Sequence, residues 1–481
     1  MPGTLAPEAN PYLSGPFAPQ SQELTAHDLA VIEGEIPREL RGMFVRNGAN
    51  PRFAPRGRYH WFDGDGMIHG VHLENGRATY ANRYVRTRDL AEEERAGTGL
   101  WGGIMDPIPP ERADRPDKDT ANTDLVWHNG RLLATWWLGG EPVEVAAPSL
   151  ETVGPYSYEG RLTCGLASHP KVDPRTGELI FIDYSPYSAP YLTYGVAAAD
   201  GSSVKTSPIE LPGPRLLHDT AITEHYTILL DFPMLWEIDR LKSGKRRVGF
   251  DTALPSRFGI VPRHGSNADV RWFETPPCYC YHTINAYEDG DAIVLTACRI
   301  ENPLPRTRES DGKIPRLFFL ELHPFLTRWR FDLKTGAVSE ERLDDRPSEF
   351  PRMNNQRLGQ RTSISYNPSI AESSELLFDG VIKYDVDRGT SEAHRWGDGR
   401  FGGEVVFAPR IDGDAPGSAE DDGWLLTFVH DSTNDAAELV ILDARNVAGK
   451  PAARLHIPQR VPIGFHAWWI RGSDLDGAAR G

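Results

Sequence analysis

Short segments in which apolar and polar residues alternate recur along nearly the whole chain. Residues 179–184 and 292–297 are clear examples, and segments of this length and pattern predict β-strands. Turn phrases that end in glycine separate many of these segments, and each phrase predicts a hairpin between two strands. The phrases are Glu74-Asn75-Gly76, His128-Asn129-Gly130, Arg175-Thr176-Gly177, Ala199-Asp200-Gly201, Glu288-Asp289-Gly290, Lys334-Thr335-Gly336 and Asp387-Arg388-Gly389.

The spacing of these turns predicts the fold. Several lie roughly 50 residues apart, which is near the repeat expected of propeller blades with four strands each. The repeat is irregular and carries no WD or kelch phrase, so a pair of β-sandwiches is the alternative. Strand-like segments continue without a linker between halves, which favours an all-β propeller. A chain of 481 residues would ordinarily be divided, but propellers are exceptions, and we expect residues 1–481 to form a single domain.

Helical patterns are sparse. Residues 89–96 form the clearest one, with Asp89 in the position of an N-cap. A second irregular zone, residues 303–328, contains the apolar phrases Leu317-Phe318-Phe319-Leu320 and Pro324-Phe325-Leu326. We expect these excursions to form a cap over one face of the propeller. The apolar phrases would either be buried in the cap or make peripheral contact with a membrane.

Composition narrows the class of partner. The formal net charge of −16 argues against nucleic acid, which requires clustered Lys and Arg. The basic stretch Arg240-Leu241-Lys242-Ser243-Gly244-Lys245-Arg246-Arg247 is more typical of a solvated loop than of a lipid-binding patch. The N-terminus has neither a basic start nor a long apolar run, and we therefore expect a cytoplasmic protein. The four cysteines are too few for a disulfide framework, which predicts free thiols.

Four histidines, each in a distinct phrase, are the candidate chemistry. They occur in Ala167-Ser168-His169-Pro170, Leu217-His218-Asp219, Tyr281-His282-Thr283-Ile284-Asn285-Ala286 and Pro462-Ile463-Gly464-Phe465-His466. A lone histidine in a strand is more often a core or surface residue than a ligand. A propeller, however, brings the inner strands of its blades to one axis, where remote side chains can meet. An all-imidazole set would suit divalent iron, zinc, copper or nickel.

Two glutamates with apolar neighbours, Glu349 and Glu404, are candidate partners for such a site. Neutral imidazoles leave the charge of a divalent ion uncompensated, so carboxylates are expected to accept hydrogen bonds from the outer ring nitrogens. From their phrases alone, an outward-facing strand residue is the favoured interpretation of each glutamate.

Further phrases identify a family resemblance. The chain resembles the carotenoid cleavage oxygenases along essentially its whole length and in order. The matching phrases are Asn10-Pro11-Tyr12-Leu13, Gly34-Glu35-Ile36-Pro37, Phe44-Val45-Arg46-Asn47-Gly48-Ala49-Asn50-Pro51, Phe62-Asp63-Gly64-Asp65-Gly66-Met67, Asp173-Pro174-Arg175-Thr176-Gly177-Glu178-Leu179, Glu420-Asp421-Asp422-Gly423 and the histidine and glutamate phrases above.

The resemblance implies a seven-bladed propeller with Fe(II) on its axis, held by His169, His218, His282 and His466. Glu349 would then support His282, and Glu404 would support His466. Similar enzymes use O2 to split a carbon–carbon double bond of an apolar conjugated substrate into two carbonyl products. No side chain beyond the metal ligands is expected to act as acid or base.

One departure from the family pattern concerns His218. The family usually places a third supporting glutamate where this chain has Trp137 or Leu138. Glu141 could replace it if its loop folds back, although an exposed loop glutamate is the simpler interpretation. Members that cleave phenolic stilbenes carry a Lys-Glu pair in this strand and a tyrosine after a Phe-Gly phrase. This chain has Trp136-Trp137 and Trp101-Gly102-Gly103-Ile104 instead, so both phenol-binding groups are absent.

These replacements favour an apolar substrate. We expect a carotenoid or apocarotenoid, bound in a tunnel lined by aromatic side chains that could alternatively be ordinary core. The rival enzyme functions are cleavage of an aryl alkene of the stilbene or phenylpropene type, and isomerohydrolysis of a retinyl ester, which nothing here favours. The rival without catalysis is a propeller binding module with a structural metal. The proposed tunnel residues are Trp101, Trp136, Trp137, Phe232 and Tyr184.

Overall fold

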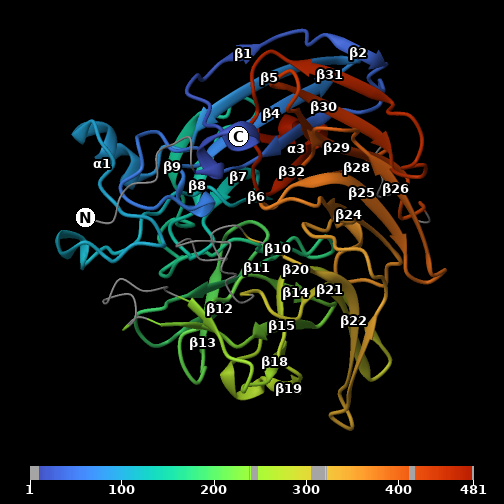
Figure 1. Ribbon diagram of the computed structural model, residues 1–481. Coiled ribbons are helices and arrows are strands. Elements are labelled where there is room, and N and C mark those ends of the chain that lie inside the picture. The colour runs from blue at the N-terminus through green and yellow to red at the C-terminus, as the bar shows by residue number, and fades with distance from the viewer. Residues whose placement is uncertain are drawn as a thin grey trace.

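The computed structural model of the protein is a seven-bladed β-propeller (Figure 1). It describes residues 10–237, 239, 248–304, 320, 322–410 and 418–478. Within these residues the strands form seven sheets of three or more strands and one two-stranded ribbon. The sheets follow one another around a ring in chain order, so that the first and last parts of the chain meet (Figure 1). The predicted propeller is confirmed and the β-sandwich alternative is wrong, whereas the single domain over residues 1–481 stays a prediction.

The blades have the following strands, given in spatial order. The blade at the two chain ends contains β1 (Thr25–Ala26), β5 (Arg77–Tyr84), β4 (Met67–Glu74), β3 (Gly42–Arg46) and β32 (Ala467–Arg471). The next two contain β6 (Asp124–His128), β7 (Arg131–Thr135), β8 (Val143–Val145) and β9 (Thr152–Pro155), then β10 (Lys171–Val172), β11 (Leu179–Tyr184), β12 (Leu192–Ala197) and β13 (Val204–Ile209). The fourth contains β14 (Thr220–Ile222), β15 (Tyr226–Asp231), β18 (Ser256–Pro262) and β19 (Arg271–Thr275), with the separate ribbon β16 (Met234–Trp236) and β17 (Val248–Phe250).

The remaining three blades complete the ring. One contains β20 (Tyr279–Asp289), β21 (Ala292–Ile300), β22 (Phe325–Asp332) and β23 (Val338–Arg342), and the next contains β24 (Ile364–Ile370), β25 (Phe378–Asp385) and β26 (Thr390–Arg395). The last contains β2 (Val31–Gly34), β31 (Ala453–Ile457), β30 (Ala436–Asp443), β29 (Gly423–Asp431) and β27 (Arg400–Phe401), with β28 (Val406–Pro409) also paired to β29. The described α-helices are α1 (Arg88–Ala96) and α3 (Gly472–Ala478). Short 3-10 helices span Pro11–Leu13, Gly15–Phe17, Trp61–Asp63, Pro110–Arg112, Asn267–Asp269 and Asn355–Arg357.

The glycine phrases lie between consecutive strands, as predicted. Between β4 and β5, for example, Asn75 and Gly76 both have positive φ angles, 52° and 73°. This backbone matches the right-handed twist of the paired strands, and it explains why asparagine followed by glycine stands there. Apolar side chains of the strands pack between neighbouring blades, as those of Val126 and Leu133 do in one cluster with Leu179 and Phe181.

Both ends of the chain take part in closing the ring. The last strand, β32, pairs with β3 near the N-terminus, with Phe44 opposite Trp469. The early strand β2 pairs with β31 of the preceding blade. Apolar side chains pack between these two blades, including Phe44 and Phe428, whose ring centroids lie 5.1 Å apart in an edge-to-face arrangement. The closure therefore rests on backbone pairing and on a buried apolar interface together.

The inner strands of the blades surround the axis. β32 contacts β6, β6 contacts β10, β10 contacts β14, and β14 contacts β20, while β28 contacts β32 from the other side. Residues 348–352 run along the inner edge of β24, where Ser348 pairs with Ser369 and Arg352 pairs with Tyr366. Side chains at these inner edges are the ones that can converge.

Three details of the sequence interpretation need comment. Helix α1 is present, but its N-cap is Thr87, whose side chain accepts a hydrogen bond from the Leu90 backbone, and Asp89 lies inside the first turn. Phe325 and Leu326 do not belong to a cap, because they begin the blade strand β22. In the other cap phrase, residues 317–319 lie outside the described residues, as does the basic stretch 240–247.

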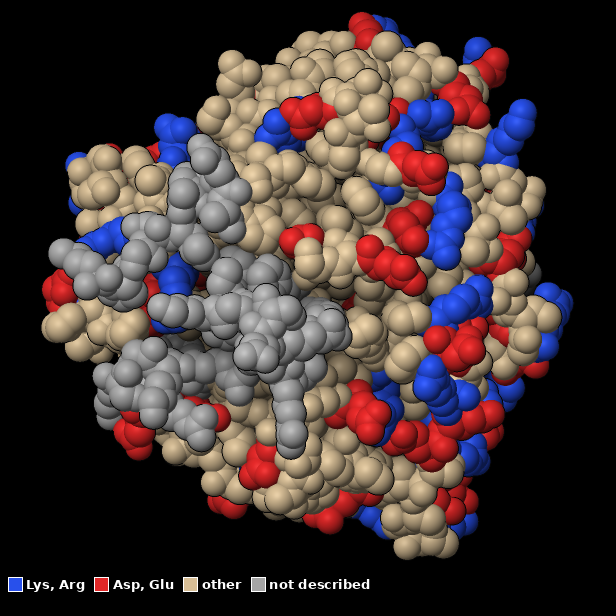
Figure 2. Space-filling model, viewed as in Figure 1, with Lys and Arg blue, Asp and Glu red and all other residues tan. Residues whose placement is uncertain are grey.

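The cysteines, the surface charges and the described helices can each be compared with what the sequence predicts. All four cysteines are free in the described structure, as predicted. On the face shown in Figure 2, described Lys and Arg side chains are interspersed with Asp and Glu. None of the helices in the described part of the chain is long and apolar enough to span a membrane.

A buried carboxylate at the turn between β10 and β11 gives a prediction about stability. Asp173 is fully buried and accepts hydrogen bonds from Arg175 and from Arg263, the latter at 2.9 Å. Although burial opposes ionisation, these guanidinium groups lower the pKa of Asp173 from 3.8 to about 2. The variant Asp173→Ala should lose roughly 3 kcal/mol of unfolding free energy, because removal of one partner leaves buried charge uncompensated.

The pH dependence of that loss is the diagnostic measurement. Because the folded pKa lies below the unfolded one, the stabilisation is complete above about pH 4 and is lost as the pH falls towards 2. Denaturant unfolding of both proteins should therefore show a gap at pH 7 that narrows at pH 3. A gap of equal size at both pH values would contradict this assignment.

Candidate metal centre

The structure brings the four candidate histidines to one point on the propeller axis. His169 and His218 lie two residues before the inner strands β10 and β14, His282 lies within β20, and His466 directly precedes β32. All four are buried, and one ring nitrogen from each lies within 4.8 Å of the others. The Nε2 atoms of His169 and His218 are 3.2 Å apart. Four blades therefore each contribute one imidazole.

The donor set fits a divalent transition metal. Burial lowers the pKa values of His169, His218 and His466 well below the ordinary value, so these rings are neutral and keep a lone pair for coordination. The His282 Nε2 atom is buried and has no hydrogen-bond partner among the described residues. Such an atom is costly unless something binds it, and zinc, iron and copper are all bound by neutral imidazole.

Two of the histidines are held by the expected glutamates. The His282 Nδ1 atom lies 2.6 Å from Glu349 Oε2, and the His466 Nδ1 atom lies 2.9 Å from Glu404 Oε1. Both carboxylates are buried, so the interpretation of these glutamates as outward-facing residues is wrong. With these contacts on Nδ1, the Nε2 atoms are left for a metal.

The local charges differ between the two pairs. Although burial opposes protonation, the adjacent Glu349 carboxylate raises the pKa of His282. Burial raises the pKa of Glu404 to about 7, and Arg352, whose Nη2 atom is 2.9 Å from Glu404 Oε2, acts in the opposite direction. The Ala467 backbone also donates to Glu404 Oε2 at 2.6 Å. Glu404 therefore connects the His466 ring to the first residue of the strand that closes the propeller.

A third carboxylate, Asp124, was not identified from the sequence. It begins the inner strand β6, and its Oδ2 atom lies 3.3 Å from His169 Nδ1. The available signal was its position at the head of a strand one blade before His169, but a strand-initial aspartate is too common to single out.

His218 differs from the other three histidines. Its Nδ1 atom is buried and has no hydrogen-bond partner among the described residues. Glu141 is exposed, so its suggested role as a replacement partner is wrong, and Leu138 is buried in the apolar core. The turn after β7, which contains Trp137 and Leu138, thus supplies no carboxylate to this ring.

An apolar cavity opens beside the histidines. It is partly open and is bordered by His218, His282 and His466, and otherwise largely by apolar side chains. These include Trp61, Phe62, Trp137, Leu320, Leu322 and Phe465. An apolar, water-poor space next to a metal is suited to binding and orienting a hydrocarbon.

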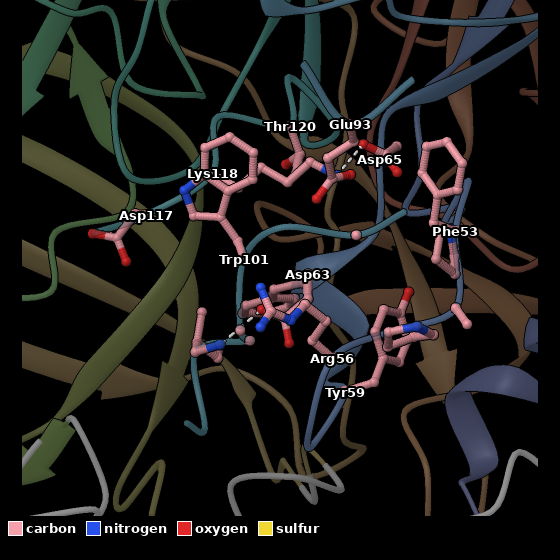
Figure 3. A pocket seen from close by; sticks show the side chains of 18 of the residues that line it. Phe53, Arg56, Tyr59, Asp63, Asp65, Glu93, Trp101, Asp117, Lys118 and Thr120 are labelled. Atoms are coloured by element: carbon pink, nitrogen blue, oxygen red, sulfur yellow. Dashed lines mark hydrogen bonds and ion pairs between the residues drawn. The ribbon is translucent and has the colours of Figure 1, made fainter. Parts of the chain in front are cut away.

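A second, outer pocket lies behind one wall of this cavity. Phe62 and Trp137 border both spaces, with their ring centroids 5.9 Å apart. Figure 3 shows the outer pocket, where Trp101 and Thr120 lie near Lys118, which forms ion pairs with Asp65 and Glu93 at 2.5 and 2.6 Å. This pocket mixes aromatic and charged side chains, whereas the inner cavity is almost wholly apolar.

The five proposed tunnel residues have different surroundings. Trp101 and Trp136 line the outer pocket, and Trp137 lines both spaces. Phe232 packs against Phe258 and Tyr279, with ring centroids 5.2 and 5.9 Å away, and borders neither space. Tyr184 is also buried outside both, and its hydroxyl donates to the Trp137 backbone carbonyl at 2.8 Å.

Comparison with known proteins places this geometry in a family. A family model described as retinal pigment epithelial membrane protein matches residues 17–471. A carotenoid 9,10(9',10')-cleavage dioxygenase 1 of Pisum sativum is 36% identical over 503 residues, which covers 98% of this chain and 91% of the plant protein. The chain belongs to the carotenoid cleavage oxygenase family. The resemblance inferred from the sequence phrases is confirmed.

Bacterial members of the carotenoid cleavage oxygenase family are also similar. A carotenoid cleavage oxygenase of Mycobacterium tuberculosis is 34% identical over 520 residues, covering 96% of this chain and 98% of its own length. Among solved structures, a lignostilbene dioxygenase of Pseudomonas brassicacearum superposes with a TM-score of 0.86 at 29% identity, covering 96% of this chain and 99% of the other. An apocarotenoid oxygenase of Synechocystis, carrying a Glu-to-Asp mutation, gives 0.82 at 29% identity, with 94% and 97% covered.

The arrangement predicts the effect of removing one imidazole. His282→Ala and His466→Ala should each lower metal affinity at least about tenfold. Loss of an outer hydrogen-bond partner of a ligand already weakens metal affinity by about this factor, and these variants remove the ligand itself. The fold should persist, because the blade cores lie elsewhere. Metal analysis by atomic emission, with circular dichroism as a check on folding, would measure this.

His128→Ala is the matched control. His128 is a buried histidine whose ring contacts the Tyr158 hydroxyl at 2.9 Å and the Gly177 carbonyl at 3.1 Å, and it is not one of the four grouped histidines. The His128→Ala variant should be less stable than the wild type but should retain the metal. Unchanged metal content in either His282→Ala or His466→Ala would remove that residue from the site.

Proposed function

We propose that the protein is an Fe(II)-dependent dioxygenase that cleaves a carbon–carbon double bond of a carotenoid or apocarotenoid with O2, giving two carbonyl products. The observation that carries the proposal is the opening of three of the four buried histidines onto an apolar cavity. The full-length similarity to proteins named carotenoid cleavage dioxygenases and oxygenases supports it.

His169, His218, His282 and His466 would hold the iron, and Glu349 and Glu404 would fix the rings of two of them. When bound, Fe(II) supplies the redox chemistry with O2 that protein side chains lack. All-nitrogen coordination alone would also accept zinc, so the choice of iron rests on the family and on the reaction.

The residues around the cavity have the task of binding and orientation. Trp137, Phe62 and Phe465 present aromatic surface that can pack along a conjugated chain and exclude water from it. No acid or base is needed from these side chains, because cleavage by O2 adds two oxygen atoms and transfers no proton to or from the alkene carbons.

Product analysis tests the function directly. Iron-loaded protein should convert a carotenoid or an apocarotenal into two carbonyl products, and both carbonyls should carry label from 18O2 after correction for exchange with water. Label in only one product would contradict a dioxygenase. A stilbene panel in the same assay tests aryl-alkene cleavage, the activity named for the Pseudomonas structure. Zinc instead of iron, with no turnover, would favour the binding module.

The wall between the two spaces yields a prediction about substrate shape. Trp137→Ala would join the inner cavity to the outer pocket, and it would keep the contacts that Trp137 makes through its backbone to Thr123 and Tyr184. The ratio of kcat/KM for a ring-ended polyene to that for an open-chain polyene should therefore rise several-fold.

Trp136→Ala provides the comparison, because Trp136 lines only the outer of the two spaces. Both variants remove an indole and should lose roughly 3 kcal/mol or more of stability. Only Trp137→Ala should alter the selectivity. Equal ratios in the wild type and both variants would show that this wall does not limit the substrate.

A further inference from the structure

The four histidines are unequally supported by carboxylates. His282 and His466 contact Glu349 and Glu404, His169 lies beside Asp124, and His218 has no partner on Nδ1 among the described residues. Metal-binding histidines ordinarily use the second ring nitrogen to contact a carboxylate, a carbonyl or water, which fixes the ring and raises its basicity. Asp124 is therefore the residue whose role the site has not yet explained.

The contacts of Asp124 join two neighbouring blades. It begins β6, and its Oδ2 atom accepts a hydrogen bond from the His169 backbone N–H at 3.2 Å while lying 3.3 Å from Nδ1 of the same residue. Its Oδ1 atom accepts from the Leu125 backbone at 2.8 Å. One carboxylate oxygen thus contacts both the backbone and the ring of His169.

The backbone of His169 needs such support. Its φ angle is +66°, in the left-handed region that residues with a Cβ atom seldom adopt. This conformation turns the chain immediately before β10, at the point where the ring reaches the axis. A bond to the His169 N–H from the preceding blade stabilises the turn, and the same oxygen limits rotation of the ring.

Asp124 is buried at 4% exposure, so its charge is costly unless it is used. The nearest cation is Arg352, whose Nη2 atom is 3.7 Å from Asp124 Oδ1 but only 2.9 Å from Glu404 Oε2. Arg352 therefore forms its closer ion pair with Glu404. The Oδ2 atom of Asp124 faces His169, where a bound cation would add favourable charge through the ring.

We propose that Asp124 is a positioning residue for metal binding. It fixes the ring and backbone of His169, so that the metal is held by three carboxylate-supported histidines and one unsupported histidine, His218. This inference rests on the metal site of the proposed function.

The test measures metal retention in the full-length, iron-loaded protein challenged with increasing concentrations of an Fe(II) chelator. Asp124→Ala should retain iron about 10- to 100-fold less tightly than the wild type. Asp124→Asn keeps an acceptor oxygen for the backbone and ring but loses the charge. Its iron retention should lie between that of the wild type and that of Asp124→Ala. Glu404→Gln shows the size of effect expected when an established contact to a histidine is weakened.

Asp231→Ala is the control for lost stability alone. Asp231, the last residue of β15, is an equally buried aspartate that pairs with Arg215 and Arg257, and it has no contact with the four histidines in the described part of the chain. It should destabilise the blade without changing iron retention. If lost stability alone lowered iron retention, Asp124→Ala and Asp231→Ala would both retain iron less tightly, and the inference would be contradicted.

The second readout is the electron paramagnetic resonance spectrum of the Fe(II)–nitric oxide adduct, which reports the symmetry around the iron. Its rhombicity should change in Asp124→Ala and Asp124→Asn and stay unchanged in Asp231→Ala. If Asp124→Ala does not fold, Asp124→Asn decides on the same two readouts. Wild-type retention and a wild-type spectrum in the folded Asp124 variant would overturn the inference, whereas a wild-type protein that binds no iron would overturn the proposed function itself.

Discussion

Closure of the propeller ring is the constraint on which the site depends. Each of the seven blades contributes at least one polar side chain to the group at the axis, and these include Asp124, His169, His218, His282, Glu349, Glu404 and His466. Pairing of β32 with β3 closes the ring, and the same strand follows His466 directly. The energy that closes the fold therefore also places the last imidazole, and a loss of closure would separate His466 and its support, Glu404, from the other histidines.

Electrostatics at the axis fits the charge of a divalent ion. The carboxylates of Asp124, Asp219, Glu349 and Glu404 are buried, and two partly buried cations, Arg352 and Lys171, pair with Glu404 and Asp219 at 2.9 and 2.6 Å. If all are ionised, this group carries two more negative than positive charges, equal in size to the charge of a divalent ion. Burial raises the pKa of Glu404 to about 7, so an ionised carboxylate is costly at this position.

The sequence predicted those parts of the molecule that depend on local chemistry. Asn75-Gly76 needs positive φ angles, so it marked a hairpin, and the histidine phrases pointed to residues that do converge. Features that depend on tertiary packing could not be predicted from the sequence. Asp124 could not be distinguished from any strand-initial aspartate, because its role depends on a turn in the next blade. Phe232 resembled a tunnel residue because an aromatic side chain in an alternating strand has the same pattern beside a cavity as in a core.

The same reasoning explains the assignment of Phe325 to a cap. Its apolar phrase follows a long irregular stretch, and only the pairing of β22 with β21 shows that a blade strand has begun. Local patterns thus specify where strands and turns lie, whereas the choice of neighbour depends on residues distant in sequence.

The four histidines lie between two cavities of different character. His218, His282 and His466 border the apolar cavity, while His169 borders a larger polar cavity together with Asp124, Lys171 and Arg352. A hydrocarbon in the first cavity would meet one carboxylate, Glu349, which contacts the His282 ring, whereas Asp124, Lys171 and Arg352 lie at the second cavity. Asp124 belongs to the polar side, so a contact that tunes His169 can operate without entering the substrate space. Metal binding and substrate choice can thus be altered by different residues of one site.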